Sequence, residues 1–281
     1  MQVWRMDLKS GESRQLTDVS SLDPSCVSLT QNERSLCYVD GERLIVQTGT
    51  RMQIVYSVET GWQAAGGFAL SEDGLTASLV EKRNGRFRLR LMSMRAGGGA
   101  RTIYEADQPV RFCRFRPKRS SLLYNYNGVL TLVNFDGRGS RRLAITGNAG
   151  FALWSADGRA VQYLSIPEGR ASIQLREHLP ETGEDQLIGG TTQFVSFARN
   201  GDSTVFAGIS GSKGAPYVLL FVRTARRELT VAEHKASDAR NAVVAFSVNS
   251  QRLFYNTDRE GRPAIYSMPL ERFIEDTEAP V

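Results

Sequence analysis

Short runs in which apolar and polar residues alternate follow one another along the chain and are separated by polar turns. One stretch shows the pattern well: the apolar run Val243–Phe246, a turn ending at Ser250, the alternating run Arg252–Tyr255, a polar tip at Asp258–Gly261 and the run Ala264–Met268. Alternation with period two is typical of strands, and Asp, Asn and Gly favour the turns that join them. The pattern predicts an all-β protein.

A five-residue motif marks the repeats: an apolar residue, a small or polar residue, a variable residue, Asp or Asn, and Gly or a substitute. Weaker copies begin at Leu29 and Phe115, and the clear copies are Leu70–Gly74, Trp154–Gly158, Phe197–Gly201 and Phe246–Ser250. Successive copies start 39 to 49 residues apart. This period belongs to the four-stranded blades of β-propellers.

The repeat predicts a single β-propeller domain over residues 1–281, with about seven four-stranded blades. Residues 1–18 supply only two strands and are expected to form an incomplete first blade. Residues 19–281 are expected to form six further blades. Both expectations come from counting motif copies along the sequence.

The composition of the chain excludes several classes of protein. The apolar fraction of 41% suffices for a core, and the charged fraction of 23% excludes wholesale disorder. The net charge of +5 suits an anionic partner, but no Lys/Arg block of the nucleic-acid type is present. The apolar run Tyr217–Val222 is far too short to span a membrane. We therefore expect neither nucleic acid nor membrane as a partner.

The cysteines indicate the redox environment. Cys26, Cys37 and Cys113 each lie in an apolar stretch and are too few for a disulfide framework. A bridge between Cys26 and Cys37 within one hairpin is the less favoured alternative. Buried, reduced thiols fit a reducing compartment, so we expect a cytoplasmic protein.

The head of the chain, Gln2–Thr17, and the stretch Phe246–Tyr266 carry a family resemblance. They resemble the repeats of Tol-type propellers and, more specifically, the oligogalacturonate lyase family of seven-bladed propellers. The resemblance implies a polysaccharide lyase of pectin degradation, which cleaves acidic uronate oligosaccharides by β-elimination. It also implies a divalent metal such as manganese, held by histidines and a glutamine, that neutralises the sugar carboxylate.

The sequence departs from the family at these metal positions. Counting from the motif copies, the family's histidine positions fall near Phe151 and Phe194 and at Asn241 and Val243. The glutamine position falls near Asp238. The chain contains only two histidines, so a three-histidine metal site is excluded by count. We expect no metal cofactor, and lyase turnover that is weak or absent. The alternative function is a non-catalytic propeller that binds a protein or another anionic ligand.

Several side chains remain candidates for binding a uronate. His178 is a candidate base or sugar-binding group, with Arg176 placed to pair a carboxylate, although an outward-facing polar strand end is the favoured interpretation. His234 lies in a loop between blades, and its alternative is a solvated loop histidine. Oxygen atoms of Asp238 and Asn241 could hold a hard cation weakly. The substrate-binding candidates are Arg176, His178, Gln193, His234, Asp238 and Asn241.

Three tryptophans offer rings that could stack on sugars. Trp4, Trp62 and Trp154 are spread along the chain. Trp154 occupies the apolar position of the repeat motif, so we expect it to pack in the core.

Overall fold

The computed structural model describes residues 2–20, 22–30, 34–95, 98–167, 169, 172–190 and 193–270. Contacts divide the chain into two compact units, Met1–Arg142 and Leu143–Val281, which we describe separately. Almost all regular structure in the described residues is β-strand, as the alternation predicts. Among these residues, no helix has the length and apolar character needed to cross a membrane.

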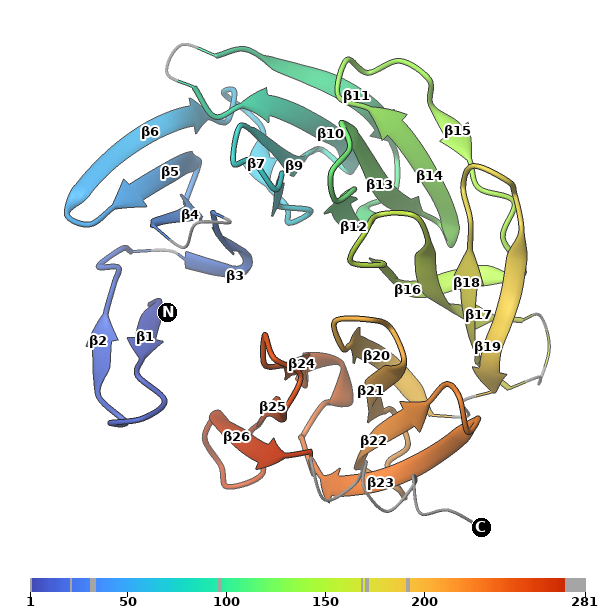
Figure 1. The fold of residues 1–281 in the computed structure, drawn as a ribbon. Helices are drawn as coiled ribbons and strands as arrows, with labels where there is room; N and C mark the ends of the chain where they lie inside the picture. Colours follow the sequence, from blue (N-terminus) through green and yellow to red (C-terminus); the bar gives the residue numbers. More distant parts are fainter. Residues whose placement is uncertain are drawn as a thin grey trace. The chain divides into compact units, whose positions relative to one another are not determined.

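The first unit contains fifteen strands within its described residues. They are β1 (Trp4–Met6), β2 (Ser13–Gln15), β3 (Leu22–Leu29), β4 (Ser35–Asp40), β5 (Arg43–Thr48), β6 (Arg51–Ser57), β7 (Gln63–Ala64), β8 (Ala69–Leu70), β9 (Thr76–Arg83), β10 (Arg86–Ser93), β11 (Ala100–Ala106), β12 (Val110–Phe115), β13 (Ser121–Tyr126), β14 (Val129–Asn134) and β15 (Arg141–Arg142). These strands form antiparallel meanders in chain order (Figure 1). The sheets are β3–β6, β7–β11 and β12–β15, with a separate pair β1–β2.

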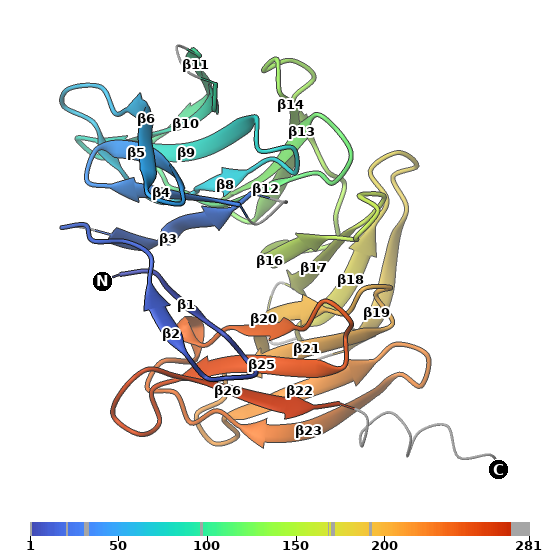
Figure 2. The same ribbon diagram turned by 60° about the vertical axis from the view of Figure 1, so that its left-hand side comes forward.

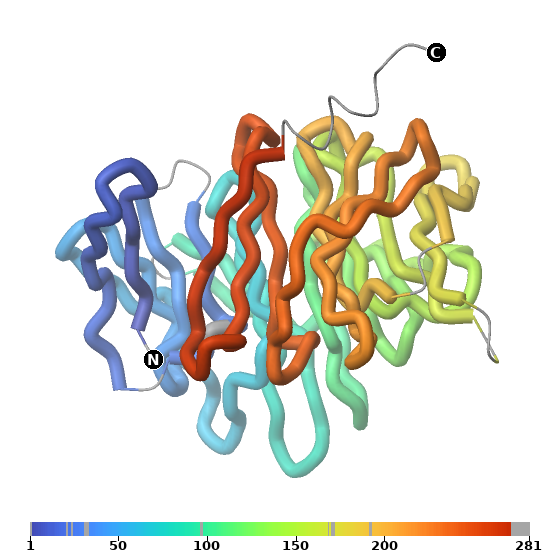
Figure 3. The backbone as a smooth tube through the Cα atoms, turned by 90° about the horizontal axis from the view of Figure 1, so that it is seen from below, coloured from blue at the N-terminus to red at the C-terminus, as the bar shows by residue number. Residues whose placement is uncertain are grey.

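The second unit contains the remaining described strands and one short 3-10 helix. They are β16 (Asn148–Trp154), β17 (Val161–Ile166), β18 (Gln174–His178), β19 (Asp185–Gly190), β20 (Phe194–Arg199), β21 (Val205–Ser210), β22 (Tyr217–Val222), β23 (Arg227–Glu233), η1 (Ala239–Asn241), β24 (Val244–Phe246), β25 (Arg252–Thr257) and β26 (Ala264–Pro269). They make the sheets β16–β19, β20–β23 and β24–β26. Figure 3 traces β20–β23 and β24–β26 as neighbouring meanders.

These sheets are the blades of a β-propeller, which confirms the predicted fold class. The described residues form six blades of three to five strands, so the count of about seven predicted for this chain is corrected to six. Residues assigned to the incomplete first blade form only the two-stranded sheet β1–β2. The motif copy that begins at Leu29 runs into residues 31–33, which lie outside the described part of the chain.

Apolar clusters fill the spaces between neighbouring blades within each unit. In the first unit, one cluster joins β3–β6 to β7–β11, and another joins β7–β11 to β12–β15. Figure 2 shows the ribbons of β3–β6 and β7–β11 as neighbouring sheets of this unit. In the second unit, clusters join β20–β23 to the blades on both sides of it in the sequence. A middle blade therefore buries both of its faces, and every polar group on its inner strands needs a partner.

The repeat motif is a hydrogen-bonded turn between the first two strands of a blade. Ser155 Oγ donates to Asp157 Oδ1 at 2.7 Å, and Asp157 Oδ1 accepts from the Arg159 amide at 3.0 Å. Gly158 follows with a φ of +70°, a conformation that glycine adopts without strain. The copy at Phe197 has Ala in the serine position, and its left-handed residue is Ser203 instead. Local chemistry thus explains why the motif recurs.

The three cysteines are buried and free, as the sequence predicts. Burial raises the pKa of Cys26 and of Cys37 to about 11 and that of Cys113 to about 12. These thiols therefore stay protonated at neutral pH. Trp154 is also buried, in agreement with a packing role.

Gly208 provides a test of the packing between blades. A Cβ added there would lie 2.4 Å from ring atoms of Phe194, which is fully buried and has little room to move. We expect Gly208→Ala to lower the free energy of unfolding by about 1–3 kcal/mol, the usual range for overpacking. Urea unfolding followed by circular dichroism measures this change.

Gly190→Ala is the matched control, because Gly190 also lies in a strand but has nothing within 4 Å of the added Cβ. We expect its free energy of unfolding to equal or slightly exceed that of the wild type. Equal destabilisation by the two substitutions would contradict the packing seen around Phe194.

Candidate functional site

A cluster of charged side chains in the first unit begins with a buried ion pair on the hairpin β9–β10. Arg88 lies directly opposite Glu81 in the strand register, so the two side chains share a face of the sheet. Arg88 Nε donates to Glu81 Oε2 at 2.6 Å, and the Glu81 side chain is fully buried. Tyr56 Oη donates to Glu81 Oε1 at 2.5 Å. Burial, together with this carboxylate, raises the pKa of Tyr56 to about 12.

A second carboxylate, that of Glu59, bridges two arginines of β10. Arg88 Nη1 donates to Glu59 Oε2 at 3.0 Å, and Arg90 Nη2 donates to Glu59 Oε1 at 3.1 Å. The Arg88 and Arg90 side chains are only 8% and 10% exposed, whereas that of Glu59 is 54% exposed. The hydrogen bond from Arg88 holds the pKa of Glu59 below its ordinary value. Glu59 therefore reaches in from solvent as an ionised carboxylate.

Trp62 fixes the orientation of the Arg88 guanidinium. The Arg88 guanidinium lies 3.9 Å from the centroid of the Trp62 ring, and the Arg83 guanidinium lies 4.5 Å from it. Trp62 itself is 5% exposed, so its ring is packed and not available for stacking on a sugar. Cation–π contact restricts the guanidinium to one plane.

The cluster has donor capacity left over. Arg88 Nη2 and Arg90 Nε are buried and have no hydrogen-bond partner. Guanidinium groups bind carboxylates through paired, charge-assisted hydrogen bonds. The arrangement is that of a carboxylate receptor which holds a side chain of its own protein. We call Arg88, Arg90, Glu59 and Trp62 the arginine cluster.

Sequence reasoning missed the arginine cluster. Its signal is the alternation Arg86, Arg88, Arg90 along one strand, which places three cations on one face. Glu59 comes from the segment before β7, and its approach to Arg88 depends on the packing of the blade. The alternation alone therefore predicts that the arginines share a face, but it does not predict that Glu59 binds two of them.

The structure places two predicted candidates around Asp185. Arg176 Nε donates to Asp185 Oδ2 at 2.8 Å, and Tyr163 Oη donates to Asp185 Oδ1 at 2.8 Å. His178 is buried, with Nδ1 at 3.8 Å from Asp185 Oδ1. Neither side chain faces outward: His178 is 1% exposed, and the Arg176 side chain is 13% exposed. Arg176 would have to leave Asp185 before it could bind a ligand carboxylate.

Gln193 and His234 are brought together through Ser210. Ser210 Oγ donates to Gln193 Oε1 at 2.8 Å, and the Ser210 carbonyl lies 3.0 Å from His234 Nε2. The Ala236 amide donates to His234 Nδ1 at 3.0 Å, so the proton resides on Nε2. The alternative of a solvated loop histidine is wrong, because His234 is only 1% exposed. With both ring nitrogens bonded to the backbone, His234 is positioned as a structural residue and not as a base.

Asp238 and Asn241 lie at the two ends of the short helix η1. Asp238 caps the helix and forms a two-oxygen ion pair with Arg240, whose Nη2 lies 2.7 Å from Asp238 Oδ2. The hydrogen bond from Arg240 lowers the pKa of Asp238 to about 2. The Asn241 carbonyl accepts from Asn256 Nδ2 at 3.1 Å. Because Arg240 already binds both Asp238 oxygens, the site is poorly suited to a hard cation.

Three of the family's metal positions carry side chains without lone pairs, which cannot bind a metal. Phe194 is fully buried in an apolar cluster, and the Phe151 ring packs edge-on against Phe197 with 5.4 Å between centroids. Val243 is an aliphatic residue at the surface. Within the described residues, no three His, Cys, Asp or Glu side chains converge as a metal site would require. The donor set therefore does not fit the family's manganese.

Comparison with solved structures identifies proteins of similar fold. No protein-family model matches the sequence, and no curated protein matches it. An oligogalacturonate lyase in complex with manganese is 20% identical, with a TM-score of 0.85 over 95% of this chain and 82% of that chain. The oligogalacturonate lyase of Vibrio parahaemolyticus is 18% identical, with a TM-score of 0.86 over 96% and 83%.

TolB from Acinetobacter baumannii is a more distant structural neighbour. It is 13% identical, with a TM-score of 0.58 over 83% of this chain and 60% of that chain. The likeness to the oligogalacturonate lyases is thus much stronger than that to TolB. At these low identities the likeness establishes a β-propeller similar in structure to oligogalacturonate lyase.

The environment of His234 predicts a pH dependence. Burial lowers its pKa below the ordinary 6.5, so the folded protein favours the neutral ring. Protons then bind the unfolded chain more tightly, and stability rises with pH between the folded and unfolded pKa values. We expect the free energy of unfolding to fall as pH drops through 6.5, and His234→Gln to reduce this fall. Urea titrations of both proteins at several pH values test it, and parallel profiles would contradict it.

Proposed function

We propose that this protein binds acidic uronate oligosaccharides, and that Arg88 and Arg90 hold a galacturonate carboxylate in the place of Glu59. The observation that carries the proposal is the bridging of two almost buried guanidinium groups by one half-exposed carboxylate. A ligand carboxylate has the same charge and the same two acceptor oxygens as the Glu59 side chain. The structural likeness to oligogalacturonate lyases supports a uronate as the ligand.

The chain's overall charge supports an anionic ligand as well. The net charge is +5, and it raises the local concentration of a polyuronate around the protein. The buried, free cysteines support a protein of the reducing cytoplasm. The proposal is therefore a cytoplasmic receptor for short uronate oligomers.

We propose binding without metal-dependent elimination. β-Elimination removes the proton next to the sugar carboxylate, breaks the adjacent glycosidic C–O bond and leaves a C=C bond in the sugar. It needs a base near that proton as well as a cation at the carboxylate. Beside the arginine cluster, Glu81 already accepts from Arg88 and Tyr56, and the Tyr56 phenol stays protonated because its pKa is about 12.

The second candidate function is lyase turnover on the same oligosaccharides. The manganese complex among the similar structures favours it. The side chains at Phe151, Phe194 and Val243 argue against it, because they have no lone pairs to offer a metal. Turnover by this chain would therefore need a base and a cation from other residues.

Isothermal titration calorimetry with trigalacturonate tests the proposal. We expect binding that weakens steeply as salt is raised and is absent for a neutral galactose trimer. Arg90→Gln should weaken binding about tenfold or more, since a charged hydrogen bond contributes roughly 1.5–3 kcal/mol. Ultraviolet absorbance should show little or no unsaturated product, with or without added Mn²⁺. Strong manganese-dependent turnover would favour the lyase instead.

Three further variants separate binding at the arginine cluster from a general charge effect. Arg43→Gln removes the same charge from an exposed position of the same unit and should leave the affinity almost unchanged. Glu59→Ala removes the internal competitor and should tighten binding severalfold, whereas Glu42→Ala, at an exposed site, should not. If all four variants bind with equal affinity, the carboxylate does not bind at Arg88 and Arg90.

A further inference from the structure

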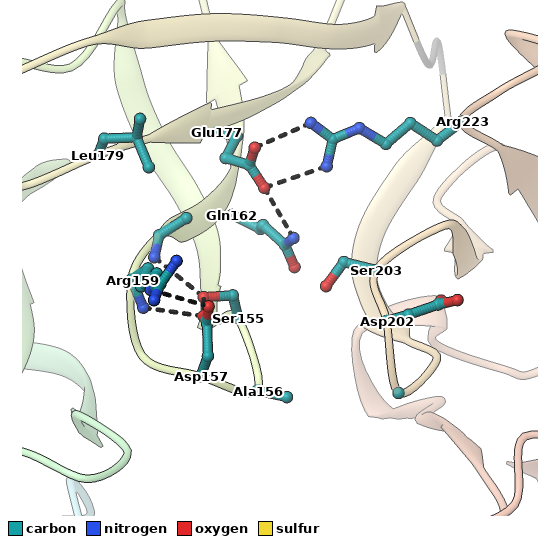
Figure 4. Close-up of a pocket in the computed structure, with 12 residues that line it drawn as sticks. Ser155, Ala156, Asp157, Arg159, Gln162, Glu177, Leu179, Asp202, Ser203 and Arg223 are labelled. Atoms are coloured by element: carbon teal, nitrogen blue, oxygen red, sulfur yellow. Dashed lines mark hydrogen bonds and ion pairs between the residues drawn. The ribbon is translucent and has the colours of Figure 1, made fainter.

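A cavity of about 460 Å³ lies between two blades of the second unit, whereas the arginine cluster belongs to the first unit (Figure 4). Its walls come from the β16–β17 turn, from β17 and β18, and from the β20–β21 turn. The volume lies in the range of small-molecule sites and is many times that of one water molecule. None of the candidates from the sequence lines it.

An ion pair and an amide hydrogen bond fix the polar floor of the cavity. Arg223 Nη2 donates to Glu177 Oε1 at 2.9 Å, and Arg223 Nη1 donates to Glu177 Oε2 at 3.2 Å. Gln162, opposite Glu177 in the strand register, donates from Nε2 to Glu177 Oε2 at 3.0 Å. Because a carboxylate accepts but does not donate, this bond determines which end of the amide is nitrogen.

The other end of the same amide has no partner. Gln162 is fully buried, and its Oε1 accepts no hydrogen bond. Figure 4 shows this oxygen directed away from Glu177, toward Ser203 on the facing turn. The feature is therefore a fixed, unused acceptor in the wall of a cavity, which a hydrogen-bond donor would satisfy.

The charges around the cavity favour a cationic donor. Its described lining includes three carboxylates, those of Asp157, Glu177 and Asp202, and two guanidinium groups, those of Arg159 and Arg223. The formal balance is therefore negative by one charge. A cavity at the corresponding turns of the first unit has two carboxylates, Glu72 and Asp73, against the cations Arg116, Lys118 and Arg119. The negative balance is thus not common to both cavities.

We propose that this cavity binds a small organic ammonium, which donates an N–H to Gln162 Oε1 and lies in the negative potential of Asp157 and Asp202. A neutral polyol would satisfy the acceptor but gain nothing from the charge, and an anion would be repelled. A bare metal ion fits poorly, because Arg223 already occupies both Glu177 oxygens. This ligand has the opposite charge to a uronate, so the proposal does not depend on the proposed function.

Three four-carbon probes of different charge test the proposal on the whole protein. Putrescine carries ammonium groups, 1,4-butanediol is its neutral analogue, and succinate is the anionic one. In ¹H–¹⁵N NMR we expect putrescine to shift the Gln162 side-chain amide and the backbone amides of Ser203 and Asp157, with saturation. Equal shifts with butanediol, or none at Gln162 with putrescine, would overturn the proposal.

Asp157→Asn provides the matched variant, because the amide oxygen can keep the turn while the charge is lost. We expect it to weaken putrescine binding severalfold. Asp73→Asn makes the same change in the same turn motif of the first unit, where Ser71 Oγ donates to Asp73 Oδ1 at 2.6 Å, and should leave binding unchanged. If Asp157→Asn and Asp73→Asn weaken putrescine binding equally, putrescine is attracted to surface carboxylates in general, and the proposed site is refuted. Gln162→Leu, if folded by circular dichroism, should abolish binding.

Discussion

Burial of both faces of a blade is the constraint on which the rest of this structure depends. In the middle blades, the two central strands are buried almost throughout: β9 and β10 in the first unit, β21 and β22 in the second. Apolar residues can be buried there without a penalty. A charged residue loses its hydration on burial, which destabilises the fold unless a partner in the protein replaces the lost water. The charged groups between blades are therefore few and closely bonded, as Arg88 and Glu81 are.

The buried polar groups differ in how completely they are satisfied. Both Asp185 side-chain oxygens accept hydrogen bonds, and each His234 ring nitrogen has a backbone partner, so these groups stabilise the fold. The arginine cluster has donors left over, whereas Gln162 has an acceptor left over. Unused donors favour an anion and an unused acceptor favours a donor, and for this reason we assign opposite ligand chemistries to the two units.

The fold could be predicted from the sequence because its signals are local. The turn at Ser155, Asp157 and Gly158 is built from bonds within a few residues, so the motif reveals the blade wherever it recurs. The blade count was less certain, since β1–β2 is only a pair of strands. The departure of Phe194 and Val243 from the metal-binding pattern was also visible in the sequence, because a side chain without lone pairs cannot bind a metal in any fold.

The sites were harder to predict because they depend on contacts between elements. His234 looks like a loop residue in the sequence, yet Ser210 and Ala236 enclose it. Arg88 looks like an ordinary charged strand residue until Glu59, Trp62 and Tyr56 are brought around it from outside its own hairpin. The exposure and the partners of such residues depend on how the elements pack together. The alternation of residues along one strand gives no information about that packing.

The pKa of Glu59, measured with and without trigalacturonate, shows whether a sugar carboxylate takes the place of Glu59 between Arg88 and Arg90. Carboxyl ¹³C NMR of glutamate-labelled protein, with the signal assigned by Glu59→Gln, follows this one group through a pH titration. We expect the pKa of Glu59 to lie below its ordinary value in the free protein, because Arg88 donates to the carboxylate. We expect it to return to the ordinary value in the saturated complex, where the sugar carboxylate replaces Glu59. A pKa that stays lowered while trigalacturonate is bound would show that the sugar carboxylate does not replace Glu59.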